Sequence, residues 1–163
     1  MKDIISEFLI LNALRDCICL RNAMNTQGLS DEKGALQSVE CLLDLLSMQR
    51  KYGLTRLTQL KKSQTAERTH GVTRAINSGG AIRVQHIHTL REWALWFIAK
   101  VDEGFSDQDL LSFIDENYRL VLVTLLHSRA LRSEFIPGTG IERFDYIGLK
   151  MDTQFYAEAG MIH

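Results

Sequence analysis

The sequence has few of the residues that cross-link a small fold. Its three cysteines, Cys17, Cys19 and Cys41, are an odd number and contain no CxxC pair. A disulfide framework needs an even set of cysteines, and structural zinc sites usually use closely paired ligands. We therefore expect no disulfide framework, no metal site and no cofactor, and we expect a reducing compartment.

Proline is also scarce, with Pro137 as its single occurrence among 163 residues. Hydrophobic residues make up 45% of the chain, far more than a disordered chain contains. This amount of apolar surface can form a core without cross-links. We expect one folded domain that spans residues 1–163.

Long apolar runs are missing as well. No run approaches the roughly 18 residues that a helix needs to cross a bilayer. The first residues include the acids Asp3 and Glu7 and lack the small-residue cleavage site of a signal peptide. We expect a cytoplasmic protein that does not bind a membrane.

Common catalytic signatures are absent too, since the sequence contains no P-loop, no GxGxxG, no HExxH and no Ser-His-Asp order. Arg83 and His88 show the R-x4-H spacing and in this respect resemble HEPN-type ribonucleases. In that family an arginine and a histidine at the start of a helix bind and cleave a phosphodiester. We expect no enzyme and assign no catalytic residue, and we keep a ribonuclease that uses Arg83 and His88 as an alternative.

The charge is distributed unevenly along the chain, although the net charge is only −1. Residues 1–49 carry four basic and seven acidic side chains, and residues 92–163 carry six and twelve. Residues 50–91 carry nine basic side chains and one acid, Glu67. A cationic segment between acidic flanks favours binding to a polyanion, because each cation that neutralises a phosphate releases condensed counterions. The alternative is that these cations pair with carboxylates inside the fold.

The spacing of apolar residues predicts a mostly helical, all-α chain with at most a short β-hairpin. Ser106 and Asp109 have the spacing of a helix-capping pair ahead of the last apolar run. Alternating Ile82 and Val84 predict a short strand after the Gly79-Gly80 break. The expected helices span residues 3–24, 37–52, 55–63, 72–76, 90–104 and 106–126.

Several short motifs in this order resemble the MarR-like winged helix-turn-helix regulators. Residues 42–46 (LLDLL) and 53–60 (GLTRLTQL) are similar to the family's entry into the helix-turn-helix. Residues 72–76 (VTRAI) are similar to the core of the recognition helix. Residues 79–83 (GGAIR) resemble the start of the wing, and residues 105–107 (FSD) resemble the start of the final dimerisation helix.

The resemblance implies a DNA-binding transcriptional regulator. Residues 37–88 would form the winged helix-turn-helix, and residues 3–24 and 90–130 would supply dimerisation helices. The homodimer would place two recognition helices about 34 Å apart on the double-stranded DNA of an inverted repeat. A small-molecule effector is a further candidate ligand.

The resemblance also implies which residues contact DNA. Some would read base edges or bind phosphates, and others would bind phosphates alone. The first group is Thr65, Arg68, Thr69, Thr73 and Arg74, and the second is Lys61, Lys62 and Arg83. A helical protein-interaction or immunity module that does not bind nucleic acid remains the main alternative.

Overall fold

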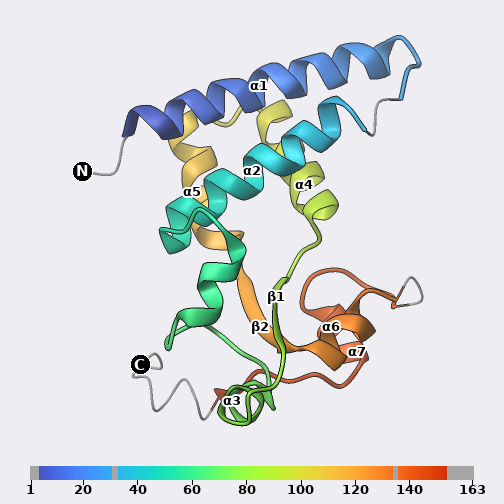
Figure 1. Cartoon of the computed structure of the whole chain (residues 1–163). Helices are drawn as coiled ribbons and strands as arrows, with labels where there is room; N and C mark the ends of the chain where they lie inside the picture. Colours follow the sequence, from blue (N-terminus) through green and yellow to red (C-terminus); the bar gives the residue numbers. More distant parts are fainter. Residues whose placement is uncertain (1–3, 31–32, 134–135, 154–163) are drawn as a thin grey trace. The chain divides into compact units, whose positions relative to one another are not determined.

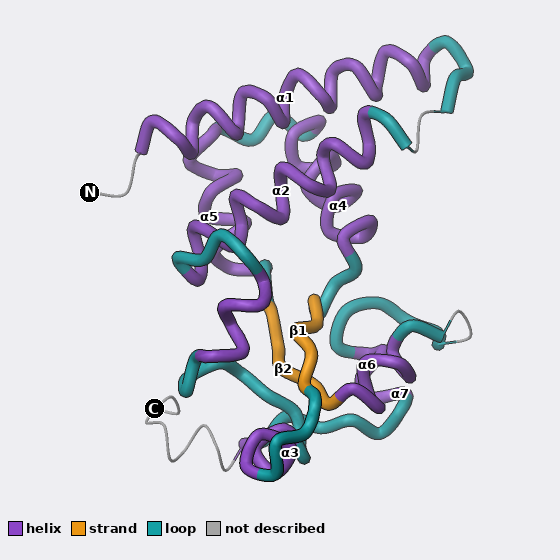
Figure 2. Tube along the Cα trace, in the orientation of Figure 1, coloured by secondary structure: helices purple, strands orange, loops and turns teal. Residues whose placement is uncertain are grey.

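The computed structural model describes residues 4–30, 33–133 and 136–153. This part of the chain is mostly helical and contains one small antiparallel sheet, which confirms the predicted helical class (Figure 1, Figure 2). The elements in chain order are α1 (Ile4–Thr26), α2 (Ala35–Tyr52), the 3-10 helix η1 (Leu57–Lys62), α3 (Val72–Asn77), β1 (Ile82–His86), α4 (Leu90–Asp102), α5 (Asp107–Asn117), β2 (Leu120–Thr124), α6 (Leu125–Leu131) and α7 (Glu142–Tyr146). None of the described helices is both long enough and apolar enough to cross a bilayer.

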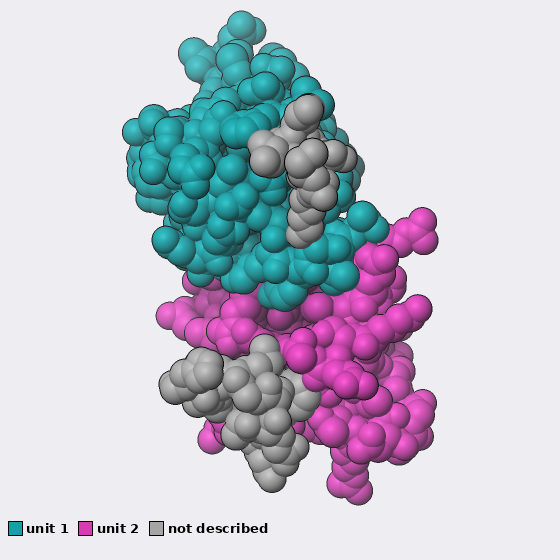
Figure 3. Space-filling view, turned by 90° about the vertical axis from the view of Figure 1, so that its left-hand side faces the viewer, with its two compact units in different colours: residues 1–55, 90–118 teal, residues 56–89, 119–163 magenta. Residues whose placement is uncertain are grey.

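The chain divides into two compact units, each built from two stretches of sequence (Figure 3). Unit 1 contains residues 1–55 and 90–118, and unit 2 contains residues 56–89 and 119–163. The sequence suggested one domain and did not suggest this division. Asp3, where the first helix was expected to begin, and residues 154–163 of the tail lie outside the described residues.

Unit 1 is a four-helix assembly in which α1 packs along α2, and α2 also contacts α4 and α5 (Figure 2). The sequence predicted the two N-terminal helices and the end of the second. The α2 helix ends at Gly53, whose φ of 68° is a left-handed conformation that suits glycine, and whose N–H donates to the Gln49 carbonyl at 2.9 Å. At the start of α5, the Ser106 hydroxyl accepts from the Asp109 N–H at 3.2 Å, as the capping spacing predicted.

Buried polar contacts fix the helices of unit 1 to one another. The Trp93 indole donates to the Ser47 hydroxyl at 3.2 Å, and the Tyr118 hydroxyl donates to the Asp44 carboxylate at 2.6 Å. The apolar side chains around them come from all four helices and are buried. They include Leu11, Leu14, Ile18, Val39, Leu43, Leu46, Phe97, Leu110 and Ile114.

Unit 2 is organised around strand β2. Its residues Leu120 to Val123 are fully buried, and β1 pairs with it in antiparallel register, with Val84 opposite Leu122. Beyond the other edge of β2, the loop before α3 adds a parallel bridge between Arg68 and Leu122. The apolar core beside the sheet consists of Ile87, Val121, Val123, Leu131, Phe144 and Leu149.

The expected helix over residues 106–126 is wrong in its second half. The structure has α5 up to Asn117, then strand β2 and then α6. An unbroken apolar run suits a buried strand as well as a buried helix, and the β-branched Val121 and Val123 favour the strand. Residues 106–126 therefore do not form the single long helix that was expected to take part in dimerisation.

The strand predicted after Gly79-Gly80, over residues 81–89, is confirmed as β1, but its partner is distant in sequence. Residues 87–119 separate β1 from β2, so the sheet is not a local hairpin of the kind that forms a wing. A long-range pairing of this type leaves no signal in the local pattern of one strand.

Candidate functional site

The two units carry net charges of opposite sign. Unit 2 contains 11 lysines and arginines against six acidic residues, which gives a net charge of +5. Unit 1 contains eight against 14, which gives −6. The basic character read from residues 50–91 therefore belongs mainly to unit 2, where the C-terminal part of the chain adds further arginines.

Some cations of residues 50–91 are neutralised inside unit 1. Arg50 forms ion pairs with Asp115 at 2.7 Å and with Glu7 at 3.1 Å, and Arg91 pairs with Glu40 at 2.6 Å. The hydrogen bond with Asp115, together with the charges of both carboxylates, raises the pKa of Arg50. Pairing with carboxylates, the alternative to polyanion binding, therefore applies at both ends of the basic segment.

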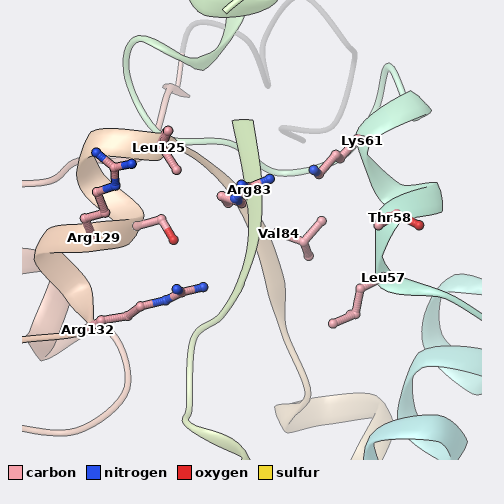
Figure 4. Close-up of a pocket in the computed structure, with 9 residues that line it drawn as sticks. Leu57, Thr58, Lys61, Arg83, Val84, Leu125, Arg129 and Arg132 are labelled. Atoms are coloured by element: carbon pink, nitrogen blue, oxygen red, sulfur yellow. The ribbon is translucent and has the colours of Figure 1, made fainter. Parts of the chain in front are cut away.

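The middle of the segment behaves differently, because it lines a pocket within unit 2 of about 450 Å³. Four cationic side chains from three elements line this basic pocket: Lys61 from η1, Arg83 from β1, and Arg129 and Arg132 at the end of α6. Figure 4 shows Lys61 and Arg132 extending toward β1 from opposite sides. Among residues 4–30, 33–133 and 136–153, no carboxylate forms an ion pair with any of these four.

The geometry of α6 explains why two arginines from one short segment meet at the basic pocket. Side chains three or four positions apart lie on the same face of a helix. Leu125, Ser128, Arg129 and Arg132 have this spacing, and all four line the pocket. The other face carries Leu131, which is 2% exposed in the core of the unit, so the helix is fixed with its arginines outward.

The charges of the basic pocket favour an anionic ligand. Four like charges around one small volume repel one another, and no acidic residue is among the nine that line it. Arg83, Arg129 and Arg132 are exposed, and their guanidinium groups can each form paired hydrogen bonds with phosphate or carboxylate oxygens. An anion in the pocket would relieve the repulsion and satisfy these donors.

The remaining lining is not charged. Leu57, Val84 and Leu125 give the basic pocket an apolar part, and Thr58 and Ser128 contribute hydroxyl-bearing residues (Figure 4). The apolar side chains have no role in holding a bare ion. The pocket therefore combines features that suit an anion with features that suit an uncharged group attached to it.

Among the eight residues predicted to contact DNA, the structure brings Lys61 and Arg83 together in the basic pocket. Lys62, Thr65 and Arg74 are exposed on the same unit but do not line the pocket. These three remain available to a ligand that extends beyond the pocket.

Arg68 holds its own loop together. Its side chain is 5% exposed, and its guanidinium donates to the carbonyls of Ser63, Gln64 and Ala66 and to the Thr73 hydroxyl at 3.3 to 3.4 Å. A sequence cannot distinguish a cation that turns inward to backbone carbonyls from one that faces a ligand. We exclude Arg68 from the proposed interface, and we exclude Thr73 because its hydroxyl accepts from this guanidinium.

Thr69 is also placed inside the fold. Its side chain is 0% exposed, its hydroxyl donates to the Leu122 carbonyl at 3.4 Å, and its N–H donates to the same carbonyl at 3.0 Å. The residue joins the loop to strand β2, so we exclude it as well.

Two residues of the basic pocket were not predicted. Arg129 lay in residues 90–130, which were expected to serve dimerisation, and Arg132 followed them with no role assigned. Their R-x-x-R spacing places both on one helix face, a signal that could have found them. That signal needs the correct end of the preceding strand, which the sequence did not provide.

Arg83 and His88 are not arranged as the ribonuclease alternative expects. That family places its arginine and histidine at the start of a helix, whereas Arg83 lies on strand β1 and His88 follows the end of that strand, before α4 begins at Leu90. The imidazole of His88 packs against Gly140, where an added Cβ would lie 2.6 Å from its Cε1 atom. We therefore do not propose that these two residues act together.

The cysteines and the metal ligands offer no comparable site. The described part of the chain has no group of three or more histidine, cysteine or acidic side chains that could hold a metal ion. Cys17, Cys19 and Cys41 are free thiols, and Cys17 and Cys41 line a shallow and largely apolar pocket in unit 1.

Comparison with known proteins returned no match to a family model, to a curated protein or to a solved structure.

Proposed function

We propose that the chain binds nucleic acid and that double-stranded DNA docks on unit 2 through its phosphate backbone. The observation that carries this proposal is the basic pocket. Lys61, Arg83, Arg129 and Arg132 come from three elements, face one concave surface and are not paired with carboxylates of the described residues. Three of them are exposed and can reach phosphates at the mouth of the pocket.

Contacts of this kind position a nucleic acid without reading its sequence. Affinity would come mainly from the release of counterions when lysine and arginine neutralise phosphates. Exposed Lys62 and Arg74 would extend the contact along the backbone.

The more specific form of the proposal is a MarR-like winged helix-turn-helix regulator that reads an inverted repeat as a homodimer. It draws on the resemblance of the short motifs and on the exposed Arg74 of α3. The six residues of α3 form a helix only about 9 Å long, shorter than most helices that enter a major groove. Selection from a random duplex library tests this form: an enriched inverted repeat supports it, and a library that stays random contradicts it.

The proposed function is tested by the salt dependence of binding to random-sequence duplex DNA, measured by fluorescence anisotropy. Four phosphate contacts, from the three exposed arginines of the pocket and Arg74, should give a slope of log affinity against log salt of about −3.6, since each contact on B-DNA contributes about −0.9. A further contact by Lys62 would make the slope steeper. The variant Arg21→Gln changes a cation of unit 1 that is hydrogen-bonded to its neighbour Asn22, and it should leave the slope unchanged. Absence of binding at low salt, or a slope near zero, would contradict the proposal.

A protein-interaction module is the second candidate function. The observations that favour it are the net charge of −6 on unit 1 and the exposed side chains of Phe8, Leu9 and Leu20 on α1. Failure to bind any nucleic acid in the salt titration would favour this candidate.

A further inference from the structure

The interior of the basic pocket has features that a duplex backbone does not use. A volume of about 450 Å³ corresponds to a cube with edges of roughly 8 Å, which is narrower than the major groove alone at about 12 Å. A duplex can touch the exposed arginines at the mouth, but it cannot enter. The volume instead falls in the range of sites that enclose a ligand of small-molecule size.

The charge around the pocket also exceeds what one internal phosphate needs. A phosphodiester carries a single negative charge, whereas a terminal phosphate monoester carries about −1.5 to −2 at neutral pH and offers three acceptor oxygens. Lys61, Arg83, Arg129 and Arg132 supply four positive charges around the same volume. A monoester matches this set of donors better than a diester.

The apolar lining points to the group attached to the phosphate. Leu57, Val84 and Leu125 line the pocket together with the four cations. Sugar and base faces are the least polar parts of a nucleotide, and contact with them would bury apolar surface on both sides. A strand end presents a terminal phosphate and one adjoining nucleotide that is free to leave the helical stack.

We propose that the basic pocket receives the phosphorylated end of a nucleic-acid strand. The terminal phosphate lies among the four cations, and the sugar or base of the last nucleotide lies against Leu57, Val84 and Leu125. This inference rests on the proposed function, because it assumes that unit 2 binds nucleic acid. It adds that the chain binds phosphorylated strand ends more tightly than nucleic acid without such ends.

The test compares four ligands by competition at constant ionic strength. They are an oligonucleotide with a terminal phosphate, the same oligonucleotide with a terminal hydroxyl, covalently closed circular DNA, and a nucleoside monophosphate. The phosphorylated oligonucleotide should bind about tenfold more tightly than its hydroxyl form, since one additional charge-assisted hydrogen bond contributes roughly that factor. Circular DNA and the free nucleotide should both compete less well.

Two variants that each lose one positive charge test whether the preference for phosphorylated ends depends on the basic pocket. Arg132→Gln removes one of the four cations of the pocket and should reduce the tenfold preference for the phosphorylated end. Arg74→Gln removes an exposed cation of α3 that does not line the pocket and should preserve the preference. Circular dichroism spectra that match the wild type establish that both variants are folded.

The possible failures can be told apart. Equal binding of both oligonucleotides and of circular DNA would overturn the preference for ends while leaving the proposed function intact. A nucleoside monophosphate that competes as well as the oligonucleotide would overturn the strand-end assignment in favour of a free nucleotide. Absence of binding to every nucleic acid would overturn the proposed function and this inference together.

Discussion

Replacing Arg68 with methionine tests whether this cation stabilises the fold or binds a ligand. The substitution keeps most of the apolar stem and removes the guanidinium, which donates to four acceptors at 3.3 to 3.4 Å. These bonds are long, so we assign each about 0.5 to 1 kcal/mol, which predicts a loss of about 2 to 4 kcal/mol in the free energy of unfolding. The salt dependence of DNA binding should not change, because Arg68 is buried.

Urea unfolding followed by circular dichroism measures the loss of stability. Trp93 and Trp96 are the only two tryptophans of the chain and both lie in unit 1, so tryptophan fluorescence reports on unit 1 separately. The matched control Arg74→Met makes the same substitution at an exposed position and should change stability by no more than about 0.5 kcal/mol. The reasoning would be refuted if Arg68→Met unfolded like the wild type while its salt slope became shallower.

Two further predictions concern single residues in each unit. Burial and the Asp44 carboxylate raise the pKa of Tyr118. The folded state therefore keeps a proton that the unfolded state loses above about pH 10. Beyond that pH the free energy of unfolding should fall by about 1.4 kcal/mol per pH unit. The Tyr118→Phe variant should lack this contribution, so its free energy of unfolding in urea should fall less steeply between about pH 10 and 11 than that of the wild type. The same pH dependence in both proteins would contradict the prediction. Gly140→Ala should lower thermal stability more than Gly148→Ala. Both positions have a positive φ, which disfavours alanine by about 1 to 3 kcal/mol. Of the two, only the new Cβ at position 140 would clash with His88. Equal losses would contradict the clash.

The sequence predicted the helices of unit 1 well, apart from the end of α5, because their signals are local. The period of the apolar residues, the left-handed glycine at Gly53 and the capping pair Ser106 and Asp109 each act within a few residues of the helix that they define. Residues at such positions, through a side chain or a backbone N–H, satisfy backbone groups that a helix end leaves unpaired. The prediction therefore did not depend on the rest of the fold.

Unit 2 was predicted less well, because its organisation depends on contacts between distant residues. Strand β2 is apolar on both faces, so its period does not distinguish it from a buried helix. Once Leu120 to Thr124 are placed in a helix that ends at residue 126, the separate helix α6 that carries Arg129 is not predicted. The pairing of β1 with β2 across residues 87–119 is likewise absent from any local pattern.

The candidate site shows the same limit. The count of cations in residues 50–91 correctly singled out a region that contributes to the basic pocket, through Lys61 and Arg83. A count does not show where a guanidinium points, and Arg50 and Arg68 are used inside the fold. Only the packing of the loop and of the helices separates these roles.

The salt dependence of DNA binding by the double variant Arg129→Gln/Arg132→Gln tests the central claim most directly. If both arginines neutralise phosphates, the slope of log affinity against log salt should change from about −3.6 to about −1.8. Doubling the salt concentration would then weaken binding about 3.5-fold in the variant, against about 12-fold in the wild type. Equal slopes for the two proteins would show that the basic pocket does not bind the backbone.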